Sequence, residues 1–316
     1  MNIVVLDGYT SNPGLFSWKG FEQLGSLTVY DDTPCSADVV RRCEGAQAVL
    51  TNKRELTNSD LSLLPDLKYV GIMATGCNRV NLMEARRRGI TVTNVPAYSS
   101  DTVAQLAMML LLNVIYHPYT YTPESEYKAW NGEYEDLGRP FFELAGKQIG
   151  IVGFGNIGSS MARMCAGMGM IIATDSSKPQ ELLPPGIIMM SREELFATSD
   201  VVSLHCPLTE QTRGIINKHL ISLMKSDSIL INTARGALID EYALAEALKE
   251  GKIYGAGLDV LSCEPPASDN PLLSAPNVVI TPHIGWNTTE ARKRLLEITL
   301  SNLQAWIDGR PINVVN

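Results

Sequence analysis

Short apolar runs alternate along this chain with longer stretches in which apolar residues recur at helical spacing. The short runs are continuous in Val, Ile and Leu, which is typical of strands buried on both faces of a parallel sheet. Before residue 100 the runs are NIVVLD, LTVYD, AVLTN, YVGIMAT and ITVTNVP, and from residue 147 onward they are QIGIVG, MIIATD, VVSLHC, SILINTA, GAGLDV and VVITPHI. Strands that alternate with helices in this way predict an α/β fold of doubly wound parallel sheets.

The runs fall into two series, and each series is long enough to build a Rossmann-like domain of its own. An apolar helix over residues 102–116 joins them, and the final segment predicts a long amphipathic helix that can return to the first domain. We therefore expect two Rossmann-like domains with a cleft between them. One is built from residues 1–101 plus 286–316, and the other from residues 102–285.

Two of the predicted helices carry boundary signals. Ser191 and Glu194 in SREELF match a capping box, in which each side chain accepts a hydrogen bond from the backbone of the other residue. Asp240 can cap the helix of EYALAEALK, and Gly251 follows its end. Both helices lie in the second predicted domain.

Composition and charge narrow the class of protein. The 316 residues carry a formal net charge of −8, which argues against a nucleic-acid or anionic-membrane binder. The six cysteines are scattered and form no C-x-x-C pair, so we expect no metal site, and free thiols favour a cytoplasmic location. The N-terminus predicts a strand rather than a signal peptide, and the longest apolar run is too short to span a membrane.

The stretch KQIGIVGFGNIGSSMARM places a G-x-G-x-x-G hexad between a predicted strand and a predicted helix. Gly153 permits a tight turn, Gly155 lets a pyrophosphate approach the backbone, and Gly158 lets the helix pack close to the strand. Free N–H groups at the helix start, around Asn156 and Ile157, suit phosphate oxygens. The alternative is a glycine-rich turn without a nucleotide, but the order of strand, hexad and helix favours a dinucleotide site.

An acid at the end of the next predicted strand extends this site. Asp175 lies 17 residues after Gly158, near the spacing of a carboxylate that accepts hydrogen bonds from the adenosine ribose. A 2′-phosphate would be repelled there, which favours NAD over NADP. The residues that follow are Ser176 and Ser177 rather than arginine, although Lys178 comes next.

Three polar residues stand just after predicted strands of the second domain. Arg235 follows SILINTA, Glu264 comes a few residues after GAGLDV, and His283 follows VVITP. Because ligands of open parallel sheets bind outside the carboxyl ends of the strands, the topology brings the three towards one crevice. Each residue alone has a structural alternative: Arg235 can belong to a simple turn, Glu264 to a surface loop, and His283 can be a structural histidine. Together in a dinucleotide-binding domain they favour an active site.

The chain resembles the D-isomer-specific 2-hydroxyacid dehydrogenase family over essentially its whole length. The resemblance is carried by GKQIGIVGFGNIG, HCPLTEQTRGIIN, LINTARGALIDEYAL, GLDVLSCEPP and NVVITPHIGW. Within the family it is most similar to glycerate dehydrogenases, also called hydroxypyruvate reductases, and VPAYSSDTVAQ and PHIGW support that subgroup. The resemblance implies that residues 102–285 form the NAD-binding domain and that residues 1–101 plus 286–316 form the substrate domain.

The resemblance also implies catalytic roles that the chemistry of these side chains favours. Arg235 would hold the substrate carboxylate and carbonyl oxygen, because a guanidinium offers two parallel donors. His283 would be the general acid–base. Glu264 would hydrogen-bond the imidazole, orient it and favour its protonated form.

Further site residues follow from the same resemblance. The backbone N–H groups of Thr75 and Gly76 would bind the substrate carboxylate, with Thr75 also near the nicotinamide. The other implied cofactor contacts are His205, Cys206 and Pro207 beside the adenosine, Thr212 near a phosphate, and Thr233, Ala234, Asp259 and Gly285 at the nicotinamide. His117 and His219 match no catalytic position of the family, and we expect both to be structural.

We expect NADH-dependent reduction of a small unphosphorylated 2-keto acid, with hydroxypyruvate first and glyoxylate second. Thr51 and Ile72 stand towards the strand ends where a phosphate-binding relative would carry basic residues, although Lys53 and Arg54 lie close by. The alternatives are a dehydrogenase for another small 2-keto acid and an NAD-binding, corepressor-like regulator of the same fold. The presence of all three catalytic residues favours the enzyme.

The resemblance implies a homodimer. The apolar helix over residues 102–116 and the aromatic loop after it offer surface that needs a partner. Trp286 is either a wall of the substrate pocket or a core or dimer residue.

Overall fold

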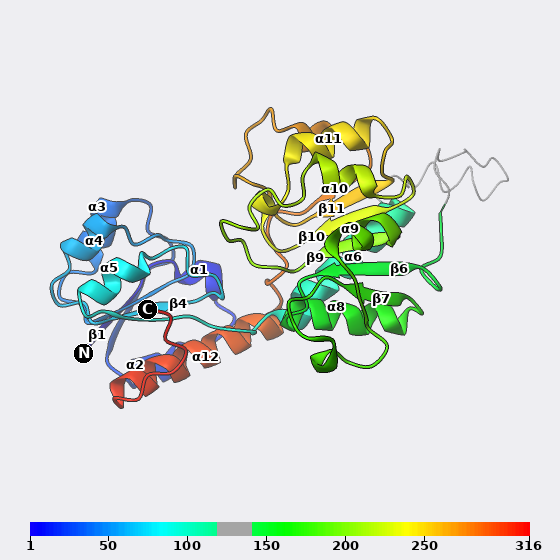
Figure 1. The fold of residues 1–316 in the computed structure, drawn as a ribbon. Coiled ribbons are helices and arrows are strands. Elements are labelled where there is room, and N and C mark those ends of the chain that lie inside the picture. The colour runs from blue at the N-terminus through cyan, green and yellow to red at the C-terminus, as the bar shows by residue number, and fades with distance from the viewer. Residues whose placement is uncertain (119–140) are drawn as a thin grey trace, which may run out of the picture. The chain divides into compact units, whose positions relative to one another are not determined.

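The computed structural model describes residues 1–118 and 141–316, and these residues form two compact units (Figure 1). Unit 1 comprises Met1–Tyr98 and Asn287–Asn316, and unit 2 comprises Ser99–Trp286. The sequence analysis places the corresponding domain boundaries after residue 101 and before residue 286. Most of the aromatic loop that follows residue 116 lies outside the described residues.

Unit 1 is built on a parallel sheet of five strands in the order β2-β1-β3-β4-β5. The strands are β1 (Asn2–Val5), β2 (Ser26–Val29), β3 (Ala48–Thr51), β4 (Tyr69–Ile72) and β5 (Thr91–Thr93). The helices are α1 (Gly8–Ser11), α2 (Lys19–Glu22), α3 (Ser36–Arg42), α4 (Asn58–Ser62), α5 (Leu82–Arg87) and the C-terminal α12 (Thr289–Ile307). The inner strands β3 and β4 are buried along their whole length and β1 along most of it, as the doubly wound prediction requires, whereas the edge strand β2 is partly exposed.

The two faces of the unit 1 sheet are covered by helices from opposite ends of the chain. Helices α3, α4 and α5 pack on one face and contribute Val39, Leu61 and Ala85 to its core. Helix α12 lies along the other face, where the ring of Trp306 packs 4.9 Å from the ring of Tyr69 (Figure 1). The predicted return of the final helix to the first domain is therefore observed, because α12 and residues 1–98 share one unit.

Unit 2 contains a parallel sheet of seven strands in the order β12-β11-β10-β9-β6-β7-β8. The strands are β6 (Gln148–Val152), β7 (Ile171–Thr174), β8 (Ile188–Met189), β9 (Val201–Leu204), β10 (Ile229–Asn232), β11 (Gly255–Leu258) and β12 (Val278–Ile280). The order reverses between β6 and β9, so the exit of β6 is the switch point where dinucleotide folds bind their ligand. The sequence analysis missed β8, which has only two residues.

Helices cover both faces of the unit 2 sheet and produce two separate cores. Helices α6 (Ser100–Tyr116) and α8 (Asn156–Gly167) bury one face, and α9 (Arg192–Thr198), α10 (Lys218–Leu223) and α11 (Glu241–Lys249) bury the other (Figure 1). The short helices η2 (Gln180–Leu182), η3 (Gly236–Leu238) and η4 (Pro271–Ser274) lie in the loops. The capping box at the start of α9 and the Asp240 cap of α11 are both confirmed.

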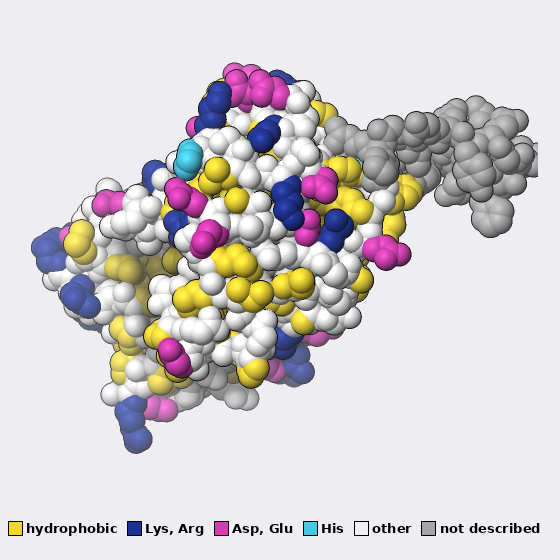
Figure 2. Space-filling model, turned by 45° about the vertical axis from the view of Figure 1, so that its right-hand side comes forward, with side chains coloured by type: hydrophobic (Ala, Val, Ile, Leu, Met, Phe, Trp, Pro, Cys, Tyr) yellow, Lys and Arg dark blue, Asp and Glu magenta, His cyan; other side chains and the backbone are white. Residues whose placement is uncertain are grey.

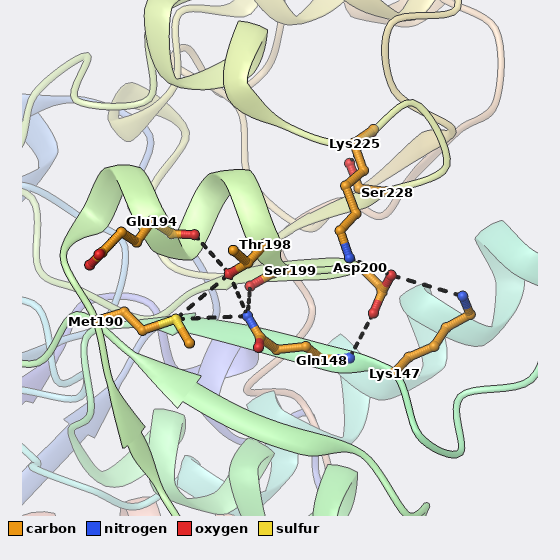
Figure 3. A network of polar contacts seen from close by, with 9 residues as sticks. All are labelled: Lys147, Gln148, Met190, Glu194, Thr198, Ser199, Asp200, Lys225 and Ser228. Atoms are coloured by element: carbon orange, nitrogen blue, oxygen red, sulfur yellow. Dashed lines mark hydrogen bonds and ion pairs between the residues drawn. The ribbon is translucent and has the colours of Figure 1, made fainter.

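A polar network ties together the amino ends of the central strands of unit 2 (Figure 3). The Asp200 carboxylate, just before β9, accepts a hydrogen bond of 2.7 Å from the Gln148 N–H and one of 2.9 Å from the Lys225 ammonium. Burial raises the pKa of Asp200, but these two donors outweigh it and hold the pKa below its ordinary value. The network therefore stabilises the edge of the sheet opposite to the strand exits.

The charged side chains on the drawn surface are of both signs, as the composition predicts (Figure 2). On the face drawn in Figure 2, Lys and Arg are interspersed with Asp and Glu and apolar side chains lie between them. No helix in the described ranges is both long and apolar enough to cross a bilayer.

Candidate active site

The glycine loop lies between β6 and α8, at the switch point of the sheet. Gly153 has φ of 89°, and a Cβ there would stand 2.7 Å from the Cys206 backbone nitrogen. A Cβ on Gly158 would stand 2.3 Å from the Gly153 carbonyl oxygen, so this glycine lets α8 pack against the turn. A Cβ on Gly155 would meet nothing within 4 Å. Gly153 therefore serves the turn, Gly158 serves the packing of the helix, and Gly155 faces open space.

The N-terminus of α8 leaves backbone donors available beside this open space. Gly155 is the N-cap, and neither a capping side chain nor an acidic residue is present in the first turn. The N–H groups of Gly155, Asn156, Ile157 and Gly158 therefore have no intrahelical partner, and the helix dipole is positive at this end. This arrangement suits an anionic group such as a pyrophosphate.

Asp175 follows β7 and lies next to the glycine loop. Its Oδ1 accepts a hydrogen bond of 3.2 Å from the Gly153 N–H, and its Oδ2 accepts one of 2.6 Å from Arg192 Nε. The sequence analysis missed Arg192, because no local signal joins the start of α9 to the end of β7. Asp175 therefore already has a cationic partner.

The exit of β9 carries the residues expected beside the adenosine. His205 Nε2 lies 2.9 Å from Ser203 Oγ, whereas its buried Nδ1 has no hydrogen-bond partner among the described residues. Burial lowers the pKa of His205 to about 4, so the ring is neutral at pH 7. Burial and the nearby Asp175 charge raise the pKa of Cys206, which keeps its thiol protonated and fits a lining role. Further along, Thr212 Oγ1 donates to the Pro207 carbonyl at 2.7 Å.

The exit of β10 presents Thr233, Ala234 and Arg235. Thr233 is buried, and its Oγ1 has no hydrogen-bond partner in the described part of the chain. Arg235 Nη1 donates to the Ala234 carbonyl at 2.7 Å, and the Arg235 carbonyl accepts from Asn232 Nδ2 at 2.9 Å. These bonds fix the turn that carries the guanidinium.

Close backbone packing brings the exits of β10 and β11 together. An added Cβ on Gly236, next to Arg235, would stand only 1.9 Å from the Leu261 carbonyl carbon. The Leu261 N–H in turn donates to Glu264 Oε1 at 3.2 Å. The loops that hold Arg235 and Glu264 are therefore in contact, which sequence spacing alone does not reveal.

Glu264 and His283 form the pair that the sequence analysis expected. Glu264 Oε2 lies 2.7 Å from His283 Nδ1, and both side chains are nearly 40% exposed, at 39% and 38%. His283 has φ of 54°, a left-handed conformation that is uncommon for a residue with a side chain. Its N–H donates to the Asp259 carbonyl at 2.9 Å, which helps to hold this conformation.

Asp259 supports the loop that carries His283. Its buried carboxylate accepts hydrogen bonds from Thr281 Oγ1 at 2.6 Å, from the Ile284 N–H at 2.9 Å and from the Gly285 N–H at 2.8 Å. Burial outweighs these donors and raises the pKa of Asp259. The contact of Asp259 and Gly285 with the nicotinamide stays a prediction. Trp286 Nε1 donates to the His283 carbonyl at 3.2 Å, and the role of Trp286 also stays a prediction.

Thr75 and Gly76 belong to unit 1, in the loop after β4. Thr75 Oγ1 donates to the Val95 carbonyl at 2.9 Å, and the Thr75 carbonyl accepts from Asn94 Nδ2 at 2.8 Å. The side chain and carbonyl of Thr75 are thus occupied, while the expected substrate contact concerns backbone N–H groups.

The two remaining histidines lie apart from the catalytic pair. His117 caps the C-terminus of α6 with φ of 46°, and its Nε2 lies 3.3 Å from the Tyr254 hydroxyl. His219 lies 3.3 Å from Glu193 on the surface. Both positions fit the structural roles expected of them.

A nicotinamide dinucleotide fits the strand exits of unit 2. The glycine loop offers open space and unpaired N–H groups for the pyrophosphate, and Asp175 stands at the end of the adjacent strand. The buried Thr233 Oγ1 and His205 Nδ1, without partners among the described residues, are polar atoms that a ligand can satisfy.

Comparison with known proteins agrees with this geometry. Residues 106–285 match the model of the D-isomer specific 2-hydroxyacid dehydrogenase, NAD binding domain. A hydroxypyruvate reductase of Blautia hydrogenotrophica is 42% identical, covering 100% of both chains. A glycerate dehydrogenase of Methylorubrum extorquens is 36% identical, covering 90% of both.

A solved structure confirms the likeness at the level of the fold. An acyclic imino acid reductase in complex with NADPH and D-Arg superposes with a TM-score of 0.87 at 29% identity, covering 100% of both chains. The family model, the full-length relatives and this two-domain likeness agree. The chain belongs to the D-isomer-specific 2-hydroxyacid dehydrogenase family and is an NAD-dependent oxidoreductase acting on 2-hydroxy acids.

Proposed function

We propose that this enzyme reduces hydroxypyruvate to D-glycerate, with glyoxylate as its second substrate and His283 as the proton donor. The observation that carries the chemistry is the 2.7 Å contact between Glu264 Oε2 and His283 Nδ1. Because Nδ1 is occupied by the carboxylate, Nε2 is the ring nitrogen left to exchange a proton with substrate. The full-length hydroxypyruvate reductase relative supports the choice of substrate.

Residues of unit 2 would hold the cofactor at the strand exits. The N–H groups of residues 155–158 would bind the pyrophosphate, Asp175 the adenosine ribose, and Thr233 and Ala234 the nicotinamide end. The remaining proposed contacts are His205, Cys206, Pro207, Thr212, Asp259, Gly285 and, from unit 1, Thr75. When bound, NADH supplies the hydride that reduces the keto carbon.

The catalytic side chains would supply the proton and the charge stabilisation. His283 Nε2 donates a proton to the carbonyl oxygen, and Arg235 stabilises the negative charge that develops there while it holds the substrate carboxylate. Glu264 fixes the ring orientation through Nδ1 and stabilises the imidazolium. In the direction of oxidation, the neutral imidazole accepts the hydroxyl proton.

The surroundings of the predicted substrate loop in unit 1 support an unphosphorylated substrate. Thr51 is fully buried, and its Oγ1 donates to the Arg54 carbonyl at 2.7 Å. The Arg54 guanidinium donates to the Pro34 carbonyl at 3.1 Å and to Ser36 Oγ at 3.2 Å. One of the two basic residues near this strand end is therefore engaged within unit 1, whereas Lys53 is exposed.

Steady-state kinetics with a panel of 2-keto acids tests this proposal. We expect NADH oxidation with the highest kcat/KM for hydroxypyruvate, a lower value for glyoxylate and the lowest for a phosphorylated 2-keto acid. A higher value for another keto acid would overturn the assignment of substrate. Tight NADH binding without turnover of any keto acid would instead favour the corepressor-like regulator.

We also propose that the enzyme is a cytoplasmic homodimer. Helix α6 carries partly buried Leu106, Met108, Met109 and Leu112 in addition to its core residues, which is apolar surface suited to a partner. Light scattering coupled to size exclusion should give twice the 34.5 kDa chain mass. A mass of one chain at micromolar concentration contradicts the dimer.

A further inference from the structure

An arginine pairs with Asp175, the acid that the sequence analysis expects at the adenosine ribose. Arg192 Nε donates to Asp175 Oδ2 at 2.6 Å, and the side chains of Arg192 and Asp175 are 35% and 5% exposed. The second oxygen of Asp175 accepts from the Gly153 N–H of the glycine loop. The carboxylate therefore links the glycine loop to the guanidinium.

This pair changes the electrostatics of the ribose position. An uncompensated carboxylate excludes NADPH, because its charge repels the 2′-phosphate. Here the positive charge of Arg192 lies in direct contact with the carboxylate and offsets that repulsion. Only Nε is engaged: the Nη donors of Arg192 make no hydrogen bond to another described residue. A guanidinium with free donors matches the geometry of a phosphate.

The loop after Asp175 adds to the same environment. Ser176 and Lys178 follow within three residues, and the Lys178 side chain is exposed. The Lys178 N–H donates to Ser176 Oγ at 3.0 Å, which ties the lysine backbone to this turn. Lys178 is therefore a second cationic residue close to Asp175 in the sequence.

We propose that Arg192 determines cofactor specificity by compensating Asp175, so that this enzyme binds NADPH as well as NADH. The inference deepens the proposed cofactor site and rests on its assignment of Asp175 to the adenosine ribose. It assigns to Arg192 the role of pairing with the 2′-phosphate. Asp175 keeps the role of accepting hydrogen bonds from the ribose hydroxyls.

Removal of the guanidinium should leave the fold intact. Arg192 is the first residue of α9, and that helix is capped by Ser191 and Glu194, whose hydrogen bonds do not involve the Arg192 side chain. Arg192→Met keeps the apolar stem and removes the charge, and Arg192→Lys keeps the charge without the planar donor group. Arg163→Met is the matched control, because Arg163 pairs with Asp101 at 3.0 Å in the same unit.

The test measures the dissociation constants of NADH and NADPH by the change in dihydronicotinamide fluorescence on binding, without any keto acid. For the wild-type enzyme we expect the two constants to agree within about tenfold. Arg192→Met should weaken NADPH by about tenfold or more while NADH changes less than about threefold. The NADPH dissociation constant of Arg192→Lys should lie between those of the wild type and Arg192→Met. Arg163→Met should match the wild type for both cofactors.

The outcomes separate the inference from the proposed reaction. Equal weakening of both cofactors in Arg192→Met, or a wild-type preference for NADH beyond about tenfold, would overturn it. Thermal unfolding of each variant shows whether it is folded. Because no substrate is present, a failure to reduce hydroxypyruvate would count against the proposed function and leave the cofactor result standing.

Discussion

The residue that carries the proposed proton transfer is held in an unusual backbone conformation. His283 has φ of 54°, a conformation that costs an L-residue roughly 1–2 kcal/mol. The hydrogen bonds from the His283 N–H to the Asp259 and Thr281 carbonyls, and the Glu264 contact at Nδ1, offset this strain. Such strain is common where a side chain must be aimed at a reacting group.

The first prediction concerns this imidazole. His283→Ala should lower kcat by about 10²–10⁴-fold, because the acid–base group is lost, while NADH affinity is retained. Glu264→Gln should give an intermediate loss, since the amide can still orient the ring but carries no charge. Both are measured by steady-state kinetics and NADH titration.

A matched histidine provides the control for this prediction. His219 also lies beside a glutamate, with its Nε2 3.3 Å from Glu193 Oε1, but both side chains are exposed, at 63% and 71%, and neither is a proposed site residue. His219→Ala should therefore keep the wild-type kcat. Near-normal kcat in His283→Ala would reject the acid–base assignment.

The second prediction concerns the glycine that faces open space. Gly155→Ala adds a Cβ that meets nothing within 4 Å, so the melting temperature without cofactor should stay near the wild-type value. The same Cβ enters the space proposed for the pyrophosphate, so NADH should bind more weakly and raise the melting temperature less. An undiminished NADH-dependent rise would show that the pyrophosphate lies elsewhere.

At the scale of elements, local signals placed the strands and helix starts well. The capping box of Ser191 and Glu194 and the cap at Asp240 act within one helical turn, so the sequence predicts them directly. Strand β8 was missed because its apolar run, IIMM between Gly186 and Ser191, is only four residues long and only two of them pair in the sheet. The network around Asp200 was also missed, because its members precede three different elements.

The third prediction tests that network. Asp200→Asn should lower the free energy of unfolding at pH 7 by about 1–3 kcal/mol, because the charged acceptor of the Gln148 N–H and the Lys225 ammonium is lost. The pKa of Asp200 is lowered in the folded protein, so its stabilisation is present above the unfolded value of 3.8. It is lost as the pH falls through the folded value.

Urea unfolding at several pH values measures this difference. The gap between wild type and Asp200→Asn should shrink as the pH falls below 3.8. Asp101→Asn, which changes an exposed ion pair in the same unit, should leave stability unaltered. A gap that does not depend on pH would show that packing rather than charge explains the loss.

At the scale of the whole molecule, acid stability provides the fourth prediction. Burial lowers the pKa of His205 from 6.5 to about 4 in the folded protein. Between these values the unfolded chain binds the extra proton, so stability falls as the pH drops from 6.5 towards 4, by on the order of 3 kcal/mol. Urea unfolding at pH 7 and pH 5 should show the larger part of this fall, about 2 kcal/mol.

Replacement of the His205 ring identifies its contribution. His205→Gln should reduce the fall in stability between pH 7 and pH 5, whereas His219→Gln, at an exposed histidine, should not. If the free energy of unfolding falls equally with pH in the wild type and in His205→Gln, His205 is not the cause of the fall.

The sequence by itself determined what depends on neighbours along the chain. Apolar runs predicted the strands, the hexad around Gly155 predicted the tight turn before α8, and residue chemistry after the strands singled out Arg235, Glu264 and His283. Each of these rests on local propensity or on the rule that ligands meet the carboxyl ends of parallel strands.

Only the tertiary structure decided which of these groups touch. Glu264 and His283 are 19 residues apart and Asp175 and Arg192 are 17 apart, and packing of separate loops brings each pair to hydrogen-bond distance. The Gly236 backbone approaches Leu261 for the same reason. Contacts of this kind depend on the order of the strands in the sheet and on the packing of loops against one another. No short window of sequence encodes either of these.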